Sequence, residues 1–202
     1  MKRLFKTSLL LLATIPIAVA CAANPDKSVE TIQEQSQSIE GEIETIQGRE
    51  QELSHTFAKS LNQGTDQEYD QSVLEDNRNQ RQEAFEQMKS SQEKLNKALD
   101  QLSQAQEKGD HSESGADADQ KIIASGQELS QNLDSYSQHY QEVLNLEESY
   151  YSDLASEEAN FQTFYDGLEK INSQHQEAQD KLNGVKESLA GLAKPEKEGE
   201  NN

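Results

Sequence analysis

The chain has 202 residues, with 38 acidic against 18 basic side chains and a formal net charge of −20 at pH 7. A chain this acidic repels nucleic acid and anionic lipid surfaces, so we expect no nucleic-acid partner. With one cysteine and 5% aromatic residues, the composition excludes an internal disulfide framework and a wide globular core, and it suits helices packed along narrow apolar seams.

Residues 1–20 have the parts of a secretory signal peptide. Lys2, Arg3 and Lys6 form a basic start, and an apolar run follows. That run is shorter than the roughly 20 apolar residues of a membrane-spanning helix, and Pro16 interrupts it. We therefore predict a cleaved signal peptide rather than a membrane span.

Cys21 follows three small or apolar residues that resemble a lipobox, namely Ala18, Val19 and Ala20. A lipobox usually has Leu where this chain has Ala18, and the Ala-x-Ala step also fits ordinary cleavage, so plain secretion is the alternative. A free thiol is rare in an exported chain, which favours a diacylglyceryl group on Cys21. Two acyl chains give stable anchoring. The sequence thus predicts a lipoprotein on the outer face of the cell membrane, facing the cell wall.

After the lipidated cysteine and a short tether (residues 21–25), the sequence predicts a helical bundle domain over residues 26–193. In its first segment, apolar residues recur at alternating three- and four-residue steps, the spacing of a helix with one apolar seam. Asp26 or Ser28 is a candidate N-cap, and Gly64 suits the helix end. The seam positions are Val29, Ile32, Ile39, Ile43, Ile46, Leu53 and Phe57, with Ser36 and Glu50 as polar members.

A second seam begins after Gly64 and ends before Gly109. Its N-terminal half is weakened by polar side chains at seam positions. A polar stretch without periodicity follows over residues 110–117 and predicts a loop. The seam consists of Leu74, Phe85, Met88, Leu95, Leu99 and Leu102, with Arg78, Arg81 and Gln92 as polar members.

The third seam keeps its phase over ten heptads from Ile122 to Leu192. Its length favours two helices that turn near residues 147–152, because one helix of about 105 Å would leave half its seam uncovered. Its unbroken phase, without Gly or Pro at the turn, favours one long helix. We therefore expect an all-α, elongated up-and-down bundle, with four helices favoured over three. Residues 194–202 are predicted to form a disordered acidic tail.

Charged seam positions are the candidates for chemistry. Glu147 and Glu157 could pair with Arg78 or Arg81, an arrangement that more often sets helix register than catalyses a reaction, and His175 could titrate near neutral pH. Glu52-Leu53-Ser54-His55 is a Glu-x-x-His step, but di-metal bundles use this step twice. We therefore predict no metal site, no cofactor and no enzymatic activity.

Aromatic residues cluster in the third segment. Two of them, Tyr151 and Tyr165, lie just off the seam and are the candidates for a surface contact with wall sugars or peptides. The others lie on the seam, where core packing is expected: Tyr136, Tyr140, Tyr150, Phe161 and Phe164.

An exported cysteine, a short tether and a mature helical domain rich in Gln and Glu together resemble the YkyA-like cell-wall binding lipoproteins of Gram-positive bacteria. The resemblance covers nearly the whole chain and implies a helical bundle outside the cytoplasmic membrane, without known catalytic residues. We expect a non-enzymatic partner of peptidoglycan or of a wall-associated protein. The alternative is a regulatory or scaffolding partner of a wall hydrolase or membrane complex.

Overall fold

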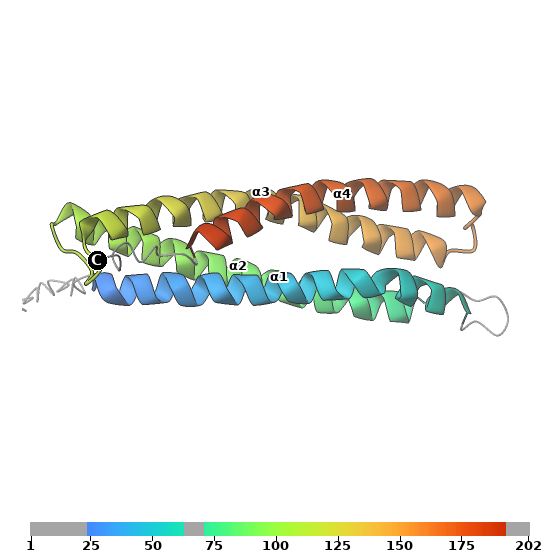
Figure 1. Cartoon of the computed structure of the whole chain (residues 1–202). Coiled ribbons are helices and arrows are strands. Elements are labelled where there is room, and N and C mark those ends of the chain that lie inside the picture. Colours follow the sequence, from blue (N-terminus) through green and yellow to red (C-terminus); the bar gives the residue numbers. More distant parts are fainter. Residues whose placement is uncertain (1–23, 63–70, 193–202) are drawn as a thin grey trace, which may run out of the picture.

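The computed structural model describes residues 24–62 and 71–192. Within these residues it has four helices and no strand, and the helices run up and down along one axis (Figure 1). The expected all-α bundle is therefore confirmed, in its four-helix form. The helices are α1 (Pro25–Asn62), α2 (Ser72–Glu107), α3 (Ala116–Leu154) and α4 (Phe161–Leu192).

The helices form two antiparallel hairpins. α1 packs along α2 and α3 packs along α4, while the hairpins meet mainly through α2 and α3, and α1 and α4 touch only sparsely. With 38 residues, α1 is about 57 Å long. The bundle is thus a rod with one loosely closed side, between its first and last helices.

The core is a row of buried side chains along the predicted seams. Its larger cluster contains Ile39, Met88, Leu133 and Leu182, one from each helix, all at most 2% exposed. A smaller cluster lies toward the end of the rod where α2 begins and α3 ends. It consists of Leu74, Tyr150, Tyr151 and Ile171. The narrow core that the composition predicts is the one that the helices build.

The start of α1 is capped two residues earlier than the nearer predicted cap, Asp26. The Asn24 side-chain oxygen accepts a hydrogen bond from the backbone N–H of Lys27 at 3.3 Å, and Pro25 takes the first helical position. Asp26, a predicted cap, instead accepts the backbone N–H of Glu113 at 2.7 Å. This bond ties the start of α1 to the loop between α2 and α3, and we call this end of the rod the near end.

The turn between α3 and α4 lies at residues 155–160, beyond the predicted position at 147–152. The Asn160 side-chain oxygen accepts the backbone N–H groups of Gln162 at 2.9 Å and Thr163 at 3.2 Å, so Asn160 caps α4. Glu157 falls in this exposed turn and not on a seam, which corrects that expectation. We call this end of the rod, which also holds the end of α1 and the start of α2, the far end.

The signal peptide (1–20), Cys21 and the acidic tail (194–202) lie outside the described residues, so those predictions stay predictions. The described helices run from Pro25 to Leu192, and the predicted domain boundaries likewise stay predictions.

Candidate functional site

A fully buried ion pair joins α2 to α3. The side chains of Arg81 and Glu147 are both 0% exposed. Arg81 Nη1 donates to Glu147 Oε1 at 3.1 Å, and Nη2 donates to Oε2, so the guanidinium meets the carboxylate in the bidentate geometry. Arg81 Nε donates to Asn77 Oδ1 at 2.9 Å. The predicted pairing of Glu147 with an arginine on the second seam is confirmed.

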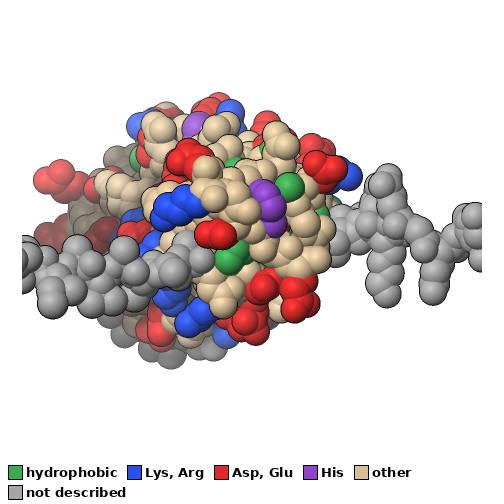
Figure 2. All heavy atoms as spheres, turned by 90° about the vertical axis from the view of Figure 1, so that its left-hand side faces the viewer, with side chains coloured by type: hydrophobic (Ala, Val, Ile, Leu, Met, Phe, Trp, Pro, Cys, Tyr) green, Lys and Arg blue, Asp and Glu red, His purple; other side chains and the backbone are tan. Residues whose placement is uncertain are grey.

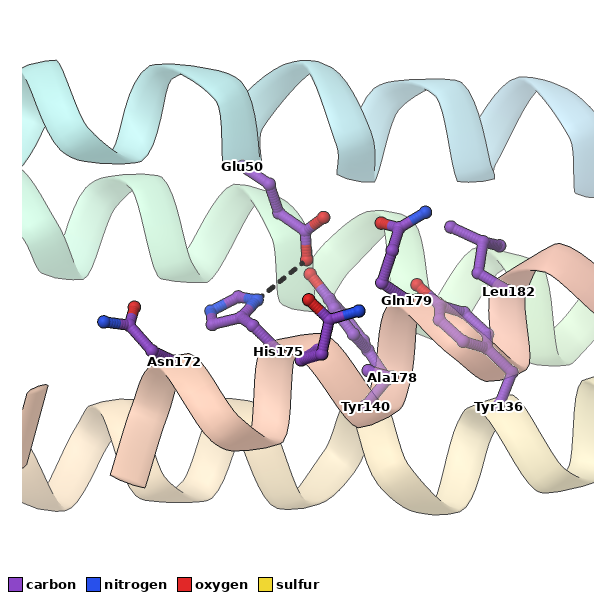
Figure 3. Close-up of a pocket in the computed structure, with 9 residues that line it drawn as sticks. Glu50, Tyr136, Tyr140, Asn172, His175, Ala178, Gln179 and Leu182 are labelled. Carbon is purple, nitrogen blue, oxygen red and sulfur yellow. Dashed lines mark ion pairs between the residues drawn. The ribbon is translucent and has the colours of Figure 1, made fainter. Parts of the chain in front are cut away.

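His175 on α4 extends this pair to α1. Its Nε2 lies 2.8 Å from Glu147 Oε1, and its Nδ1 lies 3.5 Å from Glu50 Oε1. The dashed line in Figure 3 marks the contact between His175 and Glu50. A protonated imidazole donates through both nitrogens, so it satisfies both carboxylates. We call Glu50, Arg81, Glu147 and His175 the charge network, to which each helix contributes one residue.

The pKa values of His175 and Glu147 favour the charged forms of these two side chains. Burial by itself would lower the pKa of His175, but hydrogen bonds to Glu147 and Glu50, with their negative charges, raise it to about 9. Burial would raise the pKa of Glu147, but hydrogen bonds from His175 and Arg81, with their positive charges, lower it. The network therefore holds two positive and two negative groups at neutral pH, and its charges cancel.

A cleft of about 380 Å³ lies beside the charge network, between α1, α3 and α4. Figure 3 shows Glu50 reaching down from α1, the rings of Tyr136 and Tyr140 rising from α3, and polar side chains along α4. This is the loosely closed side of the bundle. The lining residues are Glu50, Tyr136, Tyr140, Asn172, His175, Gln176, Ala178, Gln179 and Leu182.

The described residues do not form a metal centre. They contain no group of three or more His, Cys, Asp or Glu side chains arranged to hold a metal ion. Glu52 and His55, the single Glu-x-x-His step, are both exposed on α1 and do not enter the core. The predicted lack of enzymatic activity and of cofactors is not tested by this arrangement and stays a prediction.

The two tyrosines predicted at the surface differ in exposure. Tyr151 is 3% exposed and packs in the smaller core cluster, so the prediction of a surface position is wrong for this residue. Because α3 lies between α2 and α4, its buried face is wider than one seam and includes both Tyr150 and Tyr151. Tyr165 is 55% exposed, as a surface contact requires.

Tyr165 belongs to an exposed aromatic pair that the sequence did not predict. Phe161, expected in the core, is 79% exposed, because it begins α4 directly after the Asn160 cap. The two rings stack with centroids 6.4 Å apart and an angle of 24° between their planes. The polar run before Asn160 was the signal for a helix start at Phe161. We call Phe161 and Tyr165 the aromatic pair, and it lies at the far end of the rod.

The near end has a different surface. Figure 2 views this end and shows acidic and basic side chains over much of the uncovered surface, with only small apolar areas. In residues 24–62 and 71–192, none of the helices has an apolar stretch long enough to cross a membrane. The predicted lipobox (Ala18, Val19 and Ala20) and Cys21 lie outside these residues.

We expect Arg81→Met to lower the free energy of unfolding by about 3 kcal/mol, because Glu147 would stay buried without its bidentate partner. The double variant Arg81→Met/Glu147→Leu should recover most of this loss. Arg49→Met, which breaks an exposed pair with Glu52, should change stability by less than about 1 kcal/mol. Urea unfolding, monitored by circular dichroism, measures the stability of all three variants. A double variant as unstable as Arg81→Met would contradict the interpretation that the loss comes from an unpaired, buried Glu147.

We expect stability to fall as the pH rises through the pKa of His175. The folded-state pKa of about 9 exceeds the ordinary value of 6.5, so the stabilisation is complete below pH 6.5 and is lost as the pH rises through 9. The loss is at most about 3.5 kcal/mol, since one pKa unit corresponds to about 1.4 kcal/mol. Urea unfolding at a series of pH values should show this slope in the wild-type chain and a flatter one in His175→Gln. Equal slopes in the two proteins would exclude His175 as the source.

The comparisons with known proteins identify a family. The model of the YkyA family, described as "Putative cell-wall binding lipoprotein", matches residues 22–198. Searches of curated proteins and of solved structures gave no significant match. The family match covers nearly the whole chain, including all four described helices. The chain therefore belongs to the YkyA family.

Proposed function

We propose that this chain is a non-enzymatic, lipid-anchored protein that contacts peptidoglycan sugars through the aromatic pair at the far end of its bundle. The family description supports a wall-binding lipoprotein. The observation that carries the proposal is the aromatic pair, whose stacked rings are 79% and 55% exposed. Exposed apolar side chains that lie side by side and form a contiguous patch are candidates for an interaction site.

The position of the aromatic pair fits a contact with the wall. A lipid on Cys21 lies at most about 14 Å along the chain from Pro25, because an extended chain spans about 3.5 Å per residue. The near end is therefore held at the membrane, and the 38-residue α1 extends about 57 Å away from it. The aromatic pair is presented at the end of the rod that faces away from the anchor.

The charge of the chain indicates which wall component it contacts. Removal of the signal peptide takes away three basic residues and changes the formal net charge from −20 to −23. Such a protein repels polymers that carry phosphate. The flat, uncharged face of a sugar ring packs on aromatic rings without that repulsion, which favours the glycan of peptidoglycan over anionic wall polymers.

The charge network supports a structural role over a catalytic one. Glu147 and Arg81 are 0% exposed and satisfy each other in bidentate geometry, so neither is free to exchange a proton with a substrate. His175 Nε2 lies 2.8 Å from Glu147 and Nδ1 lies 3.5 Å from Glu50, so both ring nitrogens face carboxylates. A general base needs a free nitrogen within reach of its substrate, and His175 lacks one.

We expect Phe161→Ser/Tyr165→Ser to lose binding to purified sacculi, measured by co-sedimentation of the full chain in detergent. The expected drop in affinity is about tenfold, because exposed aromatic anchors dominate small contact sites. Phe161→Tyr/Tyr165→Phe is the matched control and should bind like the wild type, since both rings remain. All variants should melt alike, as both side chains are on the surface.

Two outcomes would contradict this proposal. Binding by Phe161→Ser/Tyr165→Ser at wild-type strength would show that the aromatic pair is not the contact. The absence of co-sedimentation for every variant would remove direct wall binding. The scaffolding alternative would then be favoured by a wall hydrolase that co-purifies with the anchored chain.

We expect Cys21→Ala to block lipid attachment, because the thiol is the group that the diacylglyceryl moiety modifies. The variant should leave the membrane fraction, whereas the wild-type chain should stay in it and should incorporate a labelled fatty acid. A variant that remains acylated in the membrane fraction would refute the lipobox assignment.

A further inference from the structure

The cleft between α1 and α4 contains a polar group that the bundle leaves unpartnered. Tyr136 is 1% exposed, and its hydroxyl oxygen has no hydrogen-bond partner among the described residues. The neighbouring Tyr140 hydroxyl, in contrast, accepts a hydrogen bond from Arg81 Nη1 at 3.5 Å. Buried polar atoms are almost always paired, and leaving one unpaired costs about 1–3 kcal/mol. The Tyr136 hydroxyl thus points to a group that enters the cleft.

The position of the Tyr136 hydroxyl supports this reading. Figure 3 shows the Tyr136 ring rising from α3 into the cleft, beside Gln179 on α4. The cleft has a volume of about 380 Å³, within the range of about 300–1,000 Å³ that small-molecule sites occupy. It lies where α1 and α4 touch only sparsely, on the loosely closed side of the bundle.

The charges around the cleft favour an uncharged ligand over an anionic one. Glu50 and His175 line it and form an ion pair with each other, while Glu147 is paired with Arg81. The charge network is therefore neutral as a whole, and no unpaired cation among these four residues faces the cleft to hold an anion. The acidic surface of the chain adds repulsion against anionic ligands.

The rest of the lining has the chemistry that recognises amides and hydroxyls. The side-chain amides of Asn172, Gln176 and Gln179 each offer both donors and acceptors, and Ala178 and Leu182 add an apolar surface. An N-acetylated amino sugar presents hydroxyls, an amide carbonyl and a methyl group, and its ring has a flat apolar face. Its amide carbonyl is an acceptor for the unpartnered donor of Tyr136.

From these observations we propose that the α1–α4 cleft binds an uncharged N-acetylated amino sugar, with the Tyr136 hydroxyl as a hydrogen-bond donor to it. This inference rests on the proposed wall-binding function and adds a second sugar site, on the side of the rod, to the aromatic pair at its far end. The two sites share no residue, so each can be removed without the other.

The test is a titration of the full chain in detergent with diacetylchitobiose, the β-1,4-linked dimer of N-acetylglucosamine, followed by NMR chemical shifts. We expect saturable one-site binding, and weaker or no binding of cellobiose, which lacks the N-acetyl groups. Tyr136→Phe should weaken binding roughly three- to tenfold, the effect of one hydrogen bond. Because that hydroxyl has no partner in the bundle, Tyr136→Phe should melt at the same or a higher temperature than the wild type.

Tyr150→Phe is the matched control. The Tyr150 hydroxyl donates to the backbone carbonyl of Phe164 at 3.1 Å, outside the cleft, so this variant should bind the disaccharide like the wild type. Absence of saturable binding, equal binding of cellobiose, or unchanged affinity in Tyr136→Phe would each overturn the inference. Sacculus binding that persists without disaccharide binding would overturn the cleft site alone and leave the proposed function standing.

Discussion

The bundle depends on the buried ion pair between Arg81 and Glu147. Apolar heptad seams are nearly self-similar, so one helix can slide along another by a heptad with little change in buried area. Two fully buried charges do not allow such a slip, because each would lose its partner in a water-free environment. We therefore interpret the pair as the contact that sets the register of α2 against α3, where the two hairpins meet.

The same pair leads to the cleft on the loosely closed side of the bundle. Glu147 also pairs with His175, and His175 pairs with Glu50. The charge network therefore extends from the core to the surface between α1 and α4. Charged side chains near water do not close a seam as tightly as Ile and Leu do. The cleft lies at this point, with His175 and Glu50 in its wall.

The sequence predicted the helices and part of the network, because both follow from the spacing of residues along one helix face. Glu147 was recognisable as a partner of either Arg78 or Arg81 because all three occupy seam positions, but heptad spacing did not choose between the two arginines. The buried face of α3 is wider than a seam, however, because residues that are adjacent in the chain, such as Val143 and Leu144, are both buried. Heptad spacing does not reveal such a face, because its width depends on how many neighbours a helix has. The burial of Tyr151 and the cleft at Tyr136 both follow from this tertiary packing.

A rigid rod with weak sugar contacts suits a protein held at a membrane next to the wall. Each contact proposed here involves a few side chains and an uncharged ligand, which gives low affinity in solution. The proposed lipid anchor would confine the chain to a thin layer beside the glycan, and this confinement would raise the effective concentration of each proposed site. Two sites on one rigid body add to this effect when one glycan can reach both. The charge network links all four helices between the near end and the aromatic pair, so we interpret the interior ion pair as support for the proposed contacts at the surface.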